Sequence, residues 1–125
     1  MTVTYAVAVM PLAELPGLTL HYEEHGDGPP LLLIAGIPAV ASDWVSLARR
    51  LASAGRRVIA YDNRGSGESS VTHGPYTTAQ MAANGVALLD HLGLERADVF
   101  GMSMGGMIAQ ELALGAPELV RSDFR

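Results

Sequence analysis

The sequence predicts an α/β protein in which an N-terminal hairpin precedes three strand–helix units of a mostly parallel sheet. Short apolar runs alternate with longer segments that carry one apolar face, which is the order expected of βαβ units. The predicted internal strands are continuously apolar, as is typical of strands buried on both faces. The 125 residues are 49% hydrophobic and 17% charged, which excludes a disordered chain.

The hairpin and the first unit are predicted from turn and cap signals. Apolar and polar residues alternate after a Pro16-Gly17 turn, so the hairpin is expected over residues 11–24. The first buried strand is expected at residues 31–35, which are all apolar. Ser42 or Asp43 can cap the helix that follows, and a glycine ends it.

The second and third units follow the same logic. A short apolar strand is expected at 58–61, and Thr77 and Gln80 have the spacing of a capping box at the start of the next helix. The third strand is expected at 98–101 and the third helix at 104–114, where glycine and proline end it.

Composition excludes several classes of function. The net charge is −5 and all eight cations are arginine, so neither a basic nucleic-acid surface nor a polybasic membrane patch is predicted. The absence of cysteine excludes disulfides, thiolate metal sites and a cysteine nucleophile. Residues 1–9 lack the basic segment of a secretory signal, which favours the cytoplasm. These nine residues are either a start-site extension before Met10 or an ordinary edge strand.

Ligand sites in parallel sheets lie at the carboxyl ends of the strands. This rule directs attention to residues 36–41, 62–75 and 101–106, which follow the three predicted internal strands.

The third of these loops carries the pattern Gly-x-Ser-x-Gly, as Gly101-Met102-Ser103-Met104-Gly105. A serine on a tight turn between a strand and a helix has an exposed hydroxyl, and the flanking glycines allow the strand and helix to approach closely. The N-terminus of the helix can stabilise a developing oxyanion. Ser103 is therefore predicted to be a nucleophile, while Met107 is expected to pack inside.

The loop after the second strand reads Asp62-Asn63-Arg64-Gly65-Ser66-Gly67-Glu68-Ser69. A phosphate-binding turn is not predicted, because no helix begins at these glycines and the loop follows a later strand than a dinucleotide fingerprint would.

These motifs resemble those of the α/β-hydrolase family over residues 10–121. The segments 74–81 and 105–112 are similar to those of esterase and lactonase members of the 3-oxoadipate enol-lactonase type. The resemblance implies attack by Ser103 on a small-molecule ester or lactone, through an acyl-enzyme and without a cofactor. Dehalogenases and most epoxide hydrolases of the family carry Asp at the nucleophile position, so Ser103 argues against both.

The resemblance also implies supporting roles. The backbone N–H groups of Ile37 and Met104 would form the oxyanion hole, with Gly36 retained and Ala35 in place of the usual histidine. Asp62 and Arg64 are expected to form a structural ion pair and a hydrogen-bond network that fixes their loop.

The family order of the triad is Ser, then Asp or Glu, then His, and no histidine follows Ser103. The sequence is therefore predicted to be the N-terminal part of one hydrolase domain, an inactive fragment without the acid, the histidine, the cap and the C-terminal strands. The one alternative base is His73, in the loop after the second strand, and the other histidines are expected at the surface.

Two other functions stay open. The chain is either a hydrolase fragment or a non-catalytic half-domain that pairs with itself or a partner through residues 98–100, which are expected to form an exposed sheet edge. Within the family, a cofactor-free haloperoxidase or perhydrolase is the alternative activity.

Overall fold

The computed structural model describes residues 11–36, 39–72 and 76–124, with the backbone alone for 122–124. A six-stranded sheet has the order β1-β2-β4-β3-β5-β6. The strands are β1 (Leu12–Leu15), β2 (Leu18–His25), β3 (Pro30–Ile34), β4 (Arg57–Tyr61), β5 (Ala97–Gly101) and β6 (Val120–Phe124). β1, β2 and β4 pair antiparallel, whereas β4, β3, β5 and β6 run parallel, so the predicted fold class is confirmed.

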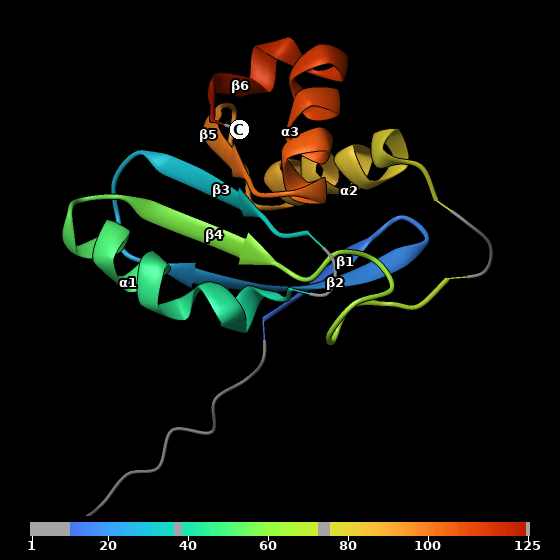
Figure 1. Ribbon diagram of the computed structural model, residues 1–125, viewed down its shortest axis with the longest axis horizontal. Coiled ribbons are helices and arrows are strands. Elements are labelled where there is room, and N and C mark those ends of the chain that lie inside the picture. Colours follow the sequence, from blue (N-terminus) through green and yellow to red (C-terminus); the bar gives the residue numbers. More distant parts are fainter. Residues whose placement is uncertain (1–10, 37–38, 73–75, 125) are drawn as a thin grey trace, which may run out of the picture.

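The helices cover the two faces of the sheet unequally (Figure 1). The helices α2 (Thr78–His91) and α3 (Met104–Gly115) pack on one face, and α1 (Val45–Ser53) packs on the other. Successive residues of β3 alternate between the two layers, with Leu32 in the core under α2 and α3 and Leu33 in the core under α1. This double burial explains why the sequence of β3 is continuously apolar.

The start of the first helical segment differs from the prediction. A short 3-10 helix, η1 (Ala41–Trp44), precedes α1, and neither Ser42 nor Asp43 is its N-cap. Instead, the Asp43 carboxylate accepts a hydrogen bond from the N–H of Val40 at 2.8 Å, so it reaches back over the preceding turn.

The predicted exposed edge at residues 98–100 is wrong. β6, which follows the 3-10 helix η2 (Pro117–Leu119), pairs with β5 in parallel and places Asp98 opposite Ser122 and Phe100 opposite Phe124. The backbone of β5 is therefore paired on both sides, and β6 is the edge strand on this side of the sheet.

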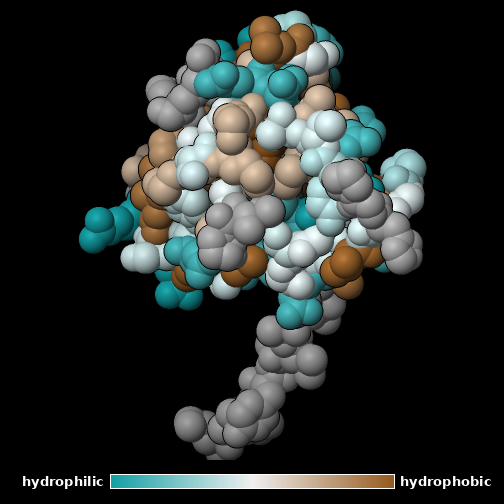
Figure 2. Space-filling view, turned by 45° about the vertical axis from the view of Figure 1, so that its right-hand side comes forward, coloured by the Kyte–Doolittle hydropathy of each residue, from teal (hydrophilic) through white to brown (hydrophobic). Residues whose placement is uncertain are grey.

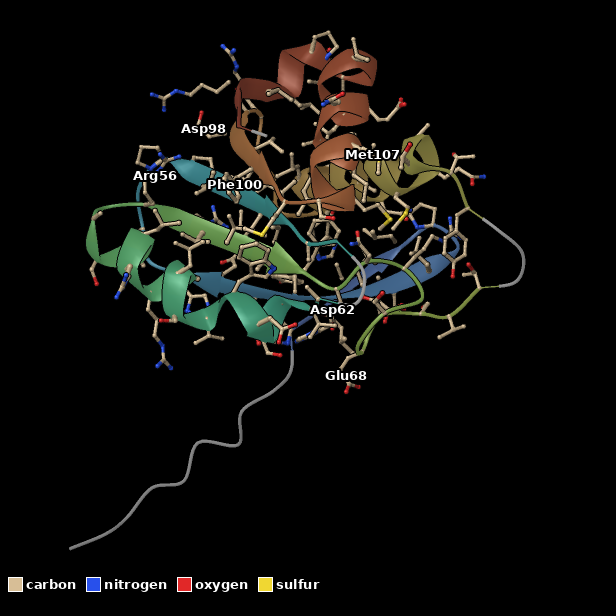
Figure 3. The ribbon with its side chains drawn as sticks, in the orientation of Figure 1. Arg56, Asp62, Glu68, Asp98, Phe100 and Met107 are labelled. Atoms are coloured by element: carbon tan, nitrogen blue, oxygen red, sulfur yellow. The ribbon has the colours of Figure 1, made fainter. Side chains whose placement is uncertain are left out.

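Among the described elements, α1 is the one α-helix that packs on its face of the sheet. A groove of about 270 Å³ there is lined by Leu31, Leu33, Leu47, Leu51, Arg56 and Phe100. Figure 3 shows Arg56 and Phe100 on this side of the sheet. Other apolar side chains are exposed in separated groups among polar ones (Figure 2), including Leu114 at 80% and Val71 at 81%.

The capping box at the start of α2 is present as predicted, and it supplies a first test. Thr77 Oγ1 accepts a hydrogen bond from the N–H of Gln80, while Gln80 Oε1 accepts one from the N–H of Thr77. We expect Thr77→Ala to lower the free energy of unfolding by about 1 kcal/mol, because the N–H of Gln80 loses its hydrogen-bond acceptor. Thr78→Ala, one residue into the helix, should change it by less than about 0.5 kcal/mol in the same urea titration. Equal effects would contradict the assigned cap.

Burial of the Tyr61 side chain should make the free energy of unfolding depend on pH in the alkaline range. Its side chain is 1% exposed, and burial raises the pKa of the phenol well above its ordinary value. The unfolded chain therefore releases this proton first as the pH rises past about 10. Stability is fully present below that pH and falls above it, by up to about 1.4 kcal/mol per unit for this group.

Tyr61→Phe removes the ionisable group and should reduce this alkaline loss of stability. Urea unfolding at about pH 8 and about pH 11 measures the difference, which should be smaller for the variant than for the unmodified chain. Identical losses in both proteins would show that Tyr61 does not carry this dependence.

Candidate active site

The loops that the sequence singles out lie at one end of the sheet. β3 pairs in parallel with β4 on one side and with β5 on the other, so the carboxyl ends of the three strands are neighbours. The candidate site is consequently built from the segments that follow Ile34, Tyr61 and Gly101.

Ser103 occupies a strained backbone position between β5 and α3. Its φ of 58° and ψ of −124° lie in a region that residues with a β-carbon rarely adopt. Among the described residues it is the one non-glycine residue with positive φ. The side chain is exposed, so the turn presents a hydroxyl at the surface.

The two flanking glycines have no room for a side chain. A β-carbon on Gly101 would lie 2.0 Å from the carbonyl oxygen of Gly105, and one on Gly105 would lie 2.1 Å from that of Ile34. Both contacts are with backbone atoms, which cannot rotate away. The sequence therefore places glycine where α3 crosses closest to β3 and β5.

The first residue of α3 and the loop after β3 come together beside Ser103. Met104 is the first residue of the helix, so its N–H is one of the four N-terminal N–H groups that have no acceptor within the helix. A β-carbon on Gly36 would lie 3.2 Å from the nitrogen of Met104 and 3.1 Å from the carbonyl oxygen of Met102. Ile37, the second predicted oxyanion donor, lies outside the described residues, as does the alternative base His73.

The predicted ion pair between Asp62 and Arg64 is wrong. Asp62 Oδ2 lies 2.8 Å from His21 Nδ1, and both residues are buried. The Arg64 side chain instead donates to Thr72 Oγ1 at 3.2 Å and lies over the ring of Tyr76, 4.9 Å from its centroid. Asp62 and Arg64 thus contact different partners instead of each other, whereas the predicted hydrogen-bond network is present around Asp62.

His21, Asn63 and Ser69 are polar residues that the sequence reasoning missed. His21 is 7% exposed, so its expected surface position is wrong. Asn63 and Ser69 are 2% and 5% exposed and also lie in the loop network. No local signal could have found His21, because it alternates with the apolar residues Leu20 and Tyr22; its burial follows from the register that pairs Tyr22 with Tyr61, next to Asp62.

Other candidate groups do not add to this site. Met107 is 53% exposed, so its expected packing inside is wrong. Within residues 11–36, 39–72 and 76–124, no group of three or more His, Cys, Asp or Glu side chains could hold a metal ion. The helices of the same segments are too short or too polar to cross a bilayer. The larger cavity, about 470 Å³ between α2 and α3, is lined by Ala82, Val86 and Leu112 among others and lies away from Ser103.

The sequence matches the alpha/beta hydrolase fold family model over residues 29–122. The protein provisionally named carbamate hydrolase RutD of Azorhizobium caulinodans is 44% identical over 113 residues, which cover 90% of this chain and 42% of that protein. Rhodomycin D methylesterase DnrP of Streptomyces peucetius is also 44% identical, over 81% of this chain and 36% of its own length. The chain thus spans about two fifths of the length of these curated relatives.

Solved structures show the same fold. The enol-lactonase from Burkholderia xenovorans superimposes with a TM-score of 0.85 at 32% identity, over 90% of this chain and 45% of that one. Epoxide hydrolases and a protein provisionally named non-heme bromoperoxidase are also similar to this chain. The similar proteins are therefore named for several different reactions, and the similarity alone does not identify the reaction of this chain.

Proposed function

This chain belongs to the alpha/beta hydrolase fold family, and on that premise we propose that it is the nucleophile-bearing N-terminal part of a serine hydrolase. The proposed substrates are small molecules with a carboxylic ester or lactone bond. The observation that carries the proposal is the strained, exposed Ser103 at the junction of β5 and α3. A methylesterase and an enol-lactonase among the similar proteins support this substrate class.

In the proposed reaction, Ser103 Oγ attacks the carbonyl carbon of the substrate while a histidine takes its proton. The oxygen of the tetrahedral intermediate receives hydrogen bonds from the N–H groups of Met104 and residue 37. Collapse breaks the ester bond, the leaving oxygen takes the proton from the histidine, and an acyl-enzyme forms on Ser103. Water then attacks the acyl-enzyme and releases the acid.

The proposed acid and histidine belong to a C-terminal part that this chain does not span. Relatives matched over most of this chain are covered over only 36–42% of their own length. The family order of the triad places both residues after the serine. The apolar groove beside α1, which is lined by Leu31, Leu33 and Phe100 among others, supports this proposal, because it is a place where further apolar residues could pack.

A second candidate is a cofactor-free perhydrolase or haloperoxidase, which the similarity to a non-heme bromoperoxidase favours. It would form the same acyl-enzyme and transfer the acyl group to hydrogen peroxide instead of water, giving a peracid. The two candidates therefore share Ser103 and differ in the final acceptor.

The test uses the protein expressed from its complete reading frame. p-Nitrophenyl acetate, dihydrocoumarin and styrene oxide represent an ester, a lactone and an epoxide, and peracid formation from acetate and hydrogen peroxide is measured in parallel. Turnover of the ester or lactone well above that of the epoxide supports the proposed function. Dominant peracid formation would favour the second candidate, and epoxide turnover alone would overturn both.

A further inference from the structure

A buried carboxylate beside the candidate site is held by three hydrogen bonds from different parts of the chain. Asp62 is 2% exposed, and its Oδ2 accepts hydrogen bonds from His21 Nδ1 at 2.8 Å and from the N–H of Glu68 at 2.9 Å. Its Oδ1 accepts one from the N–H of Ala41 at 2.7 Å. Bonds to an ionised acceptor are about twice as strong as neutral ones, so Asp62 joins β2, η1 and its own loop firmly.

The neighbouring side chain holds the other end of the same segment. Asn63 Nδ2 donates to the carbonyl oxygen of Ala35 at 2.7 Å, just after β3. Asp62 holds Ala41, so two consecutive side chains anchor both ends of the stretch between these residues. This stretch contains Gly36, which lies against the turn of Ser103.

Two further contacts keep Asp62 in place. Ser69 Oγ donates to the carbonyl oxygen of Asp62 at 2.6 Å and accepts from the N–H of His21 at 2.9 Å. Gly67 has a φ of +50°, and a β-carbon there would lie 2.2 Å from Asp62 Oδ2. The loop therefore packs directly against the carboxylate of Asp62, and glycine at position 67 makes this close contact possible.

From this arrangement we infer that Asp62 and Asn63 are positioning residues for the oxyanion loop, with His21 orienting Asp62. They hold this loop at its two ends, Ala35 and Ala41, and Gly36 beside Ala35 lies against the turn of Ser103, so the end of β3 is fixed against that turn before substrate arrives. Preorganised donors stabilise the transition state because they need no rearrangement during the reaction. This inference rests on the proposed function, since it assigns a task to that same site.

The decisive variant is Asp62→Asn, which has nearly the same shape. The amide must present an N–H₂ group either to the N–H of Ala41 or to the N–H of Glu68, so at least one hydrogen bond is lost. Asp27→Asn is the matched control, because it makes the same substitution at an exposed residue between β2 and β3 that takes no part in this network.

Two measurements separate positioning from general stability. With a p-nitrophenyl ester and the protein from its complete reading frame, Asp62→Asn should lower kcat about 10- to 100-fold, while KM changes less than about 3-fold. Amide hydrogen exchange at Ala41 should become at least about 10-fold faster, while the β3 and β4 amides exchange as before. Asp27→Asn should change neither quantity.

His21→Asn provides a second, conservative test, because its amide nitrogen can occupy the position of His21 Nδ1 and still donate to Asp62. It should keep most of the activity that His21→Leu loses. If Asp62→Asn does not fold, the comparison of His21→Asn with His21→Leu tests the inference in its place.

Unchanged kcat and Ala41 exchange in Asp62→Asn, or equal losses in the two His21 variants, would overturn the inference. If the unmodified protein has no hydrolase activity, the proposed function fails instead. Hydrogen exchange at Ala41 would still decide whether Asp62 holds this segment.

Discussion

Replacing Ser103 with alanine should lower kcat for ester hydrolysis by about 10⁴-fold or more, because the acyl-enzyme cannot form without the hydroxyl. The exposed Ser46→Ala, on α1, is the matched control and should leave kcat unchanged. The comparison uses the protein from its complete reading frame and a p-nitrophenyl ester. A Ser103→Ala variant with near-normal kcat would remove Ser103 from the mechanism.

The same position should show the opposite effect on stability. With φ at 58° and ψ at −124°, Ser103 carries strain that a glycine would not. We expect Ser103→Gly to raise the free energy of unfolding by about 1 kcal/mol, after allowing for the greater flexibility of glycine in the unfolded chain. Ser103→Ala keeps the β-carbon and should not show this gain. Urea unfolding of both variants makes the comparison.

Gly105→Ala should cause a large loss of stability through the addition of a single methyl group. The new β-carbon would lie 2.1 Å from the carbonyl oxygen of Ile34, so α3 must move away from β3. Overpacking of this kind costs about 1–3 kcal/mol, and a backbone contact this short places the variant at or above the top of that range.

Gly106→Ala is a matched control one residue along the same helix. Its β-carbon would meet its nearest atom, the carbonyl oxygen of Gly101, at 3.5 Å, which is an ordinary contact. Alanine is favoured over glycine in a helix by about 0.5–1 kcal/mol, so this variant should be neutral or more stable. Equal changes in the two variants would contradict the close crossing of α3 and β3.

Local sequence patterns predicted most of the fold because they reflect burial within one element. The continuous apolar residues of β3 follow from its two covered faces, and the Thr77–Gln80 capping box needs only contacts three residues apart. Gly101 and Gly105 were informative for the same reason, since close packing at the nucleophile turn leaves glycine as the residue that fits.

The errors concern contacts between distant segments. His21 and Asp62 are 41 positions apart, and nothing local distinguishes a buried histidine in a half-buried strand from an exposed one. Asp62 and Arg64 are close in sequence, yet Asp62 is buried at the end of β4 whereas Arg64 lies over the ring of Tyr76. β6 was missed because its residues are mostly polar, and its pairing depends on the register of β5.

The most direct test of the central claim is covalent labelling of Ser103 by a fluorophosphonate, which traps activated serine nucleophiles. The protein from its complete reading frame is incubated with the probe, digested and mapped by mass spectrometry. We expect a single phosphonylated site at Ser103, with loss of ester hydrolysis in proportion to labelling. Full ester turnover with Ser103 unlabelled, or labelling at a different serine that abolishes activity, would contradict it.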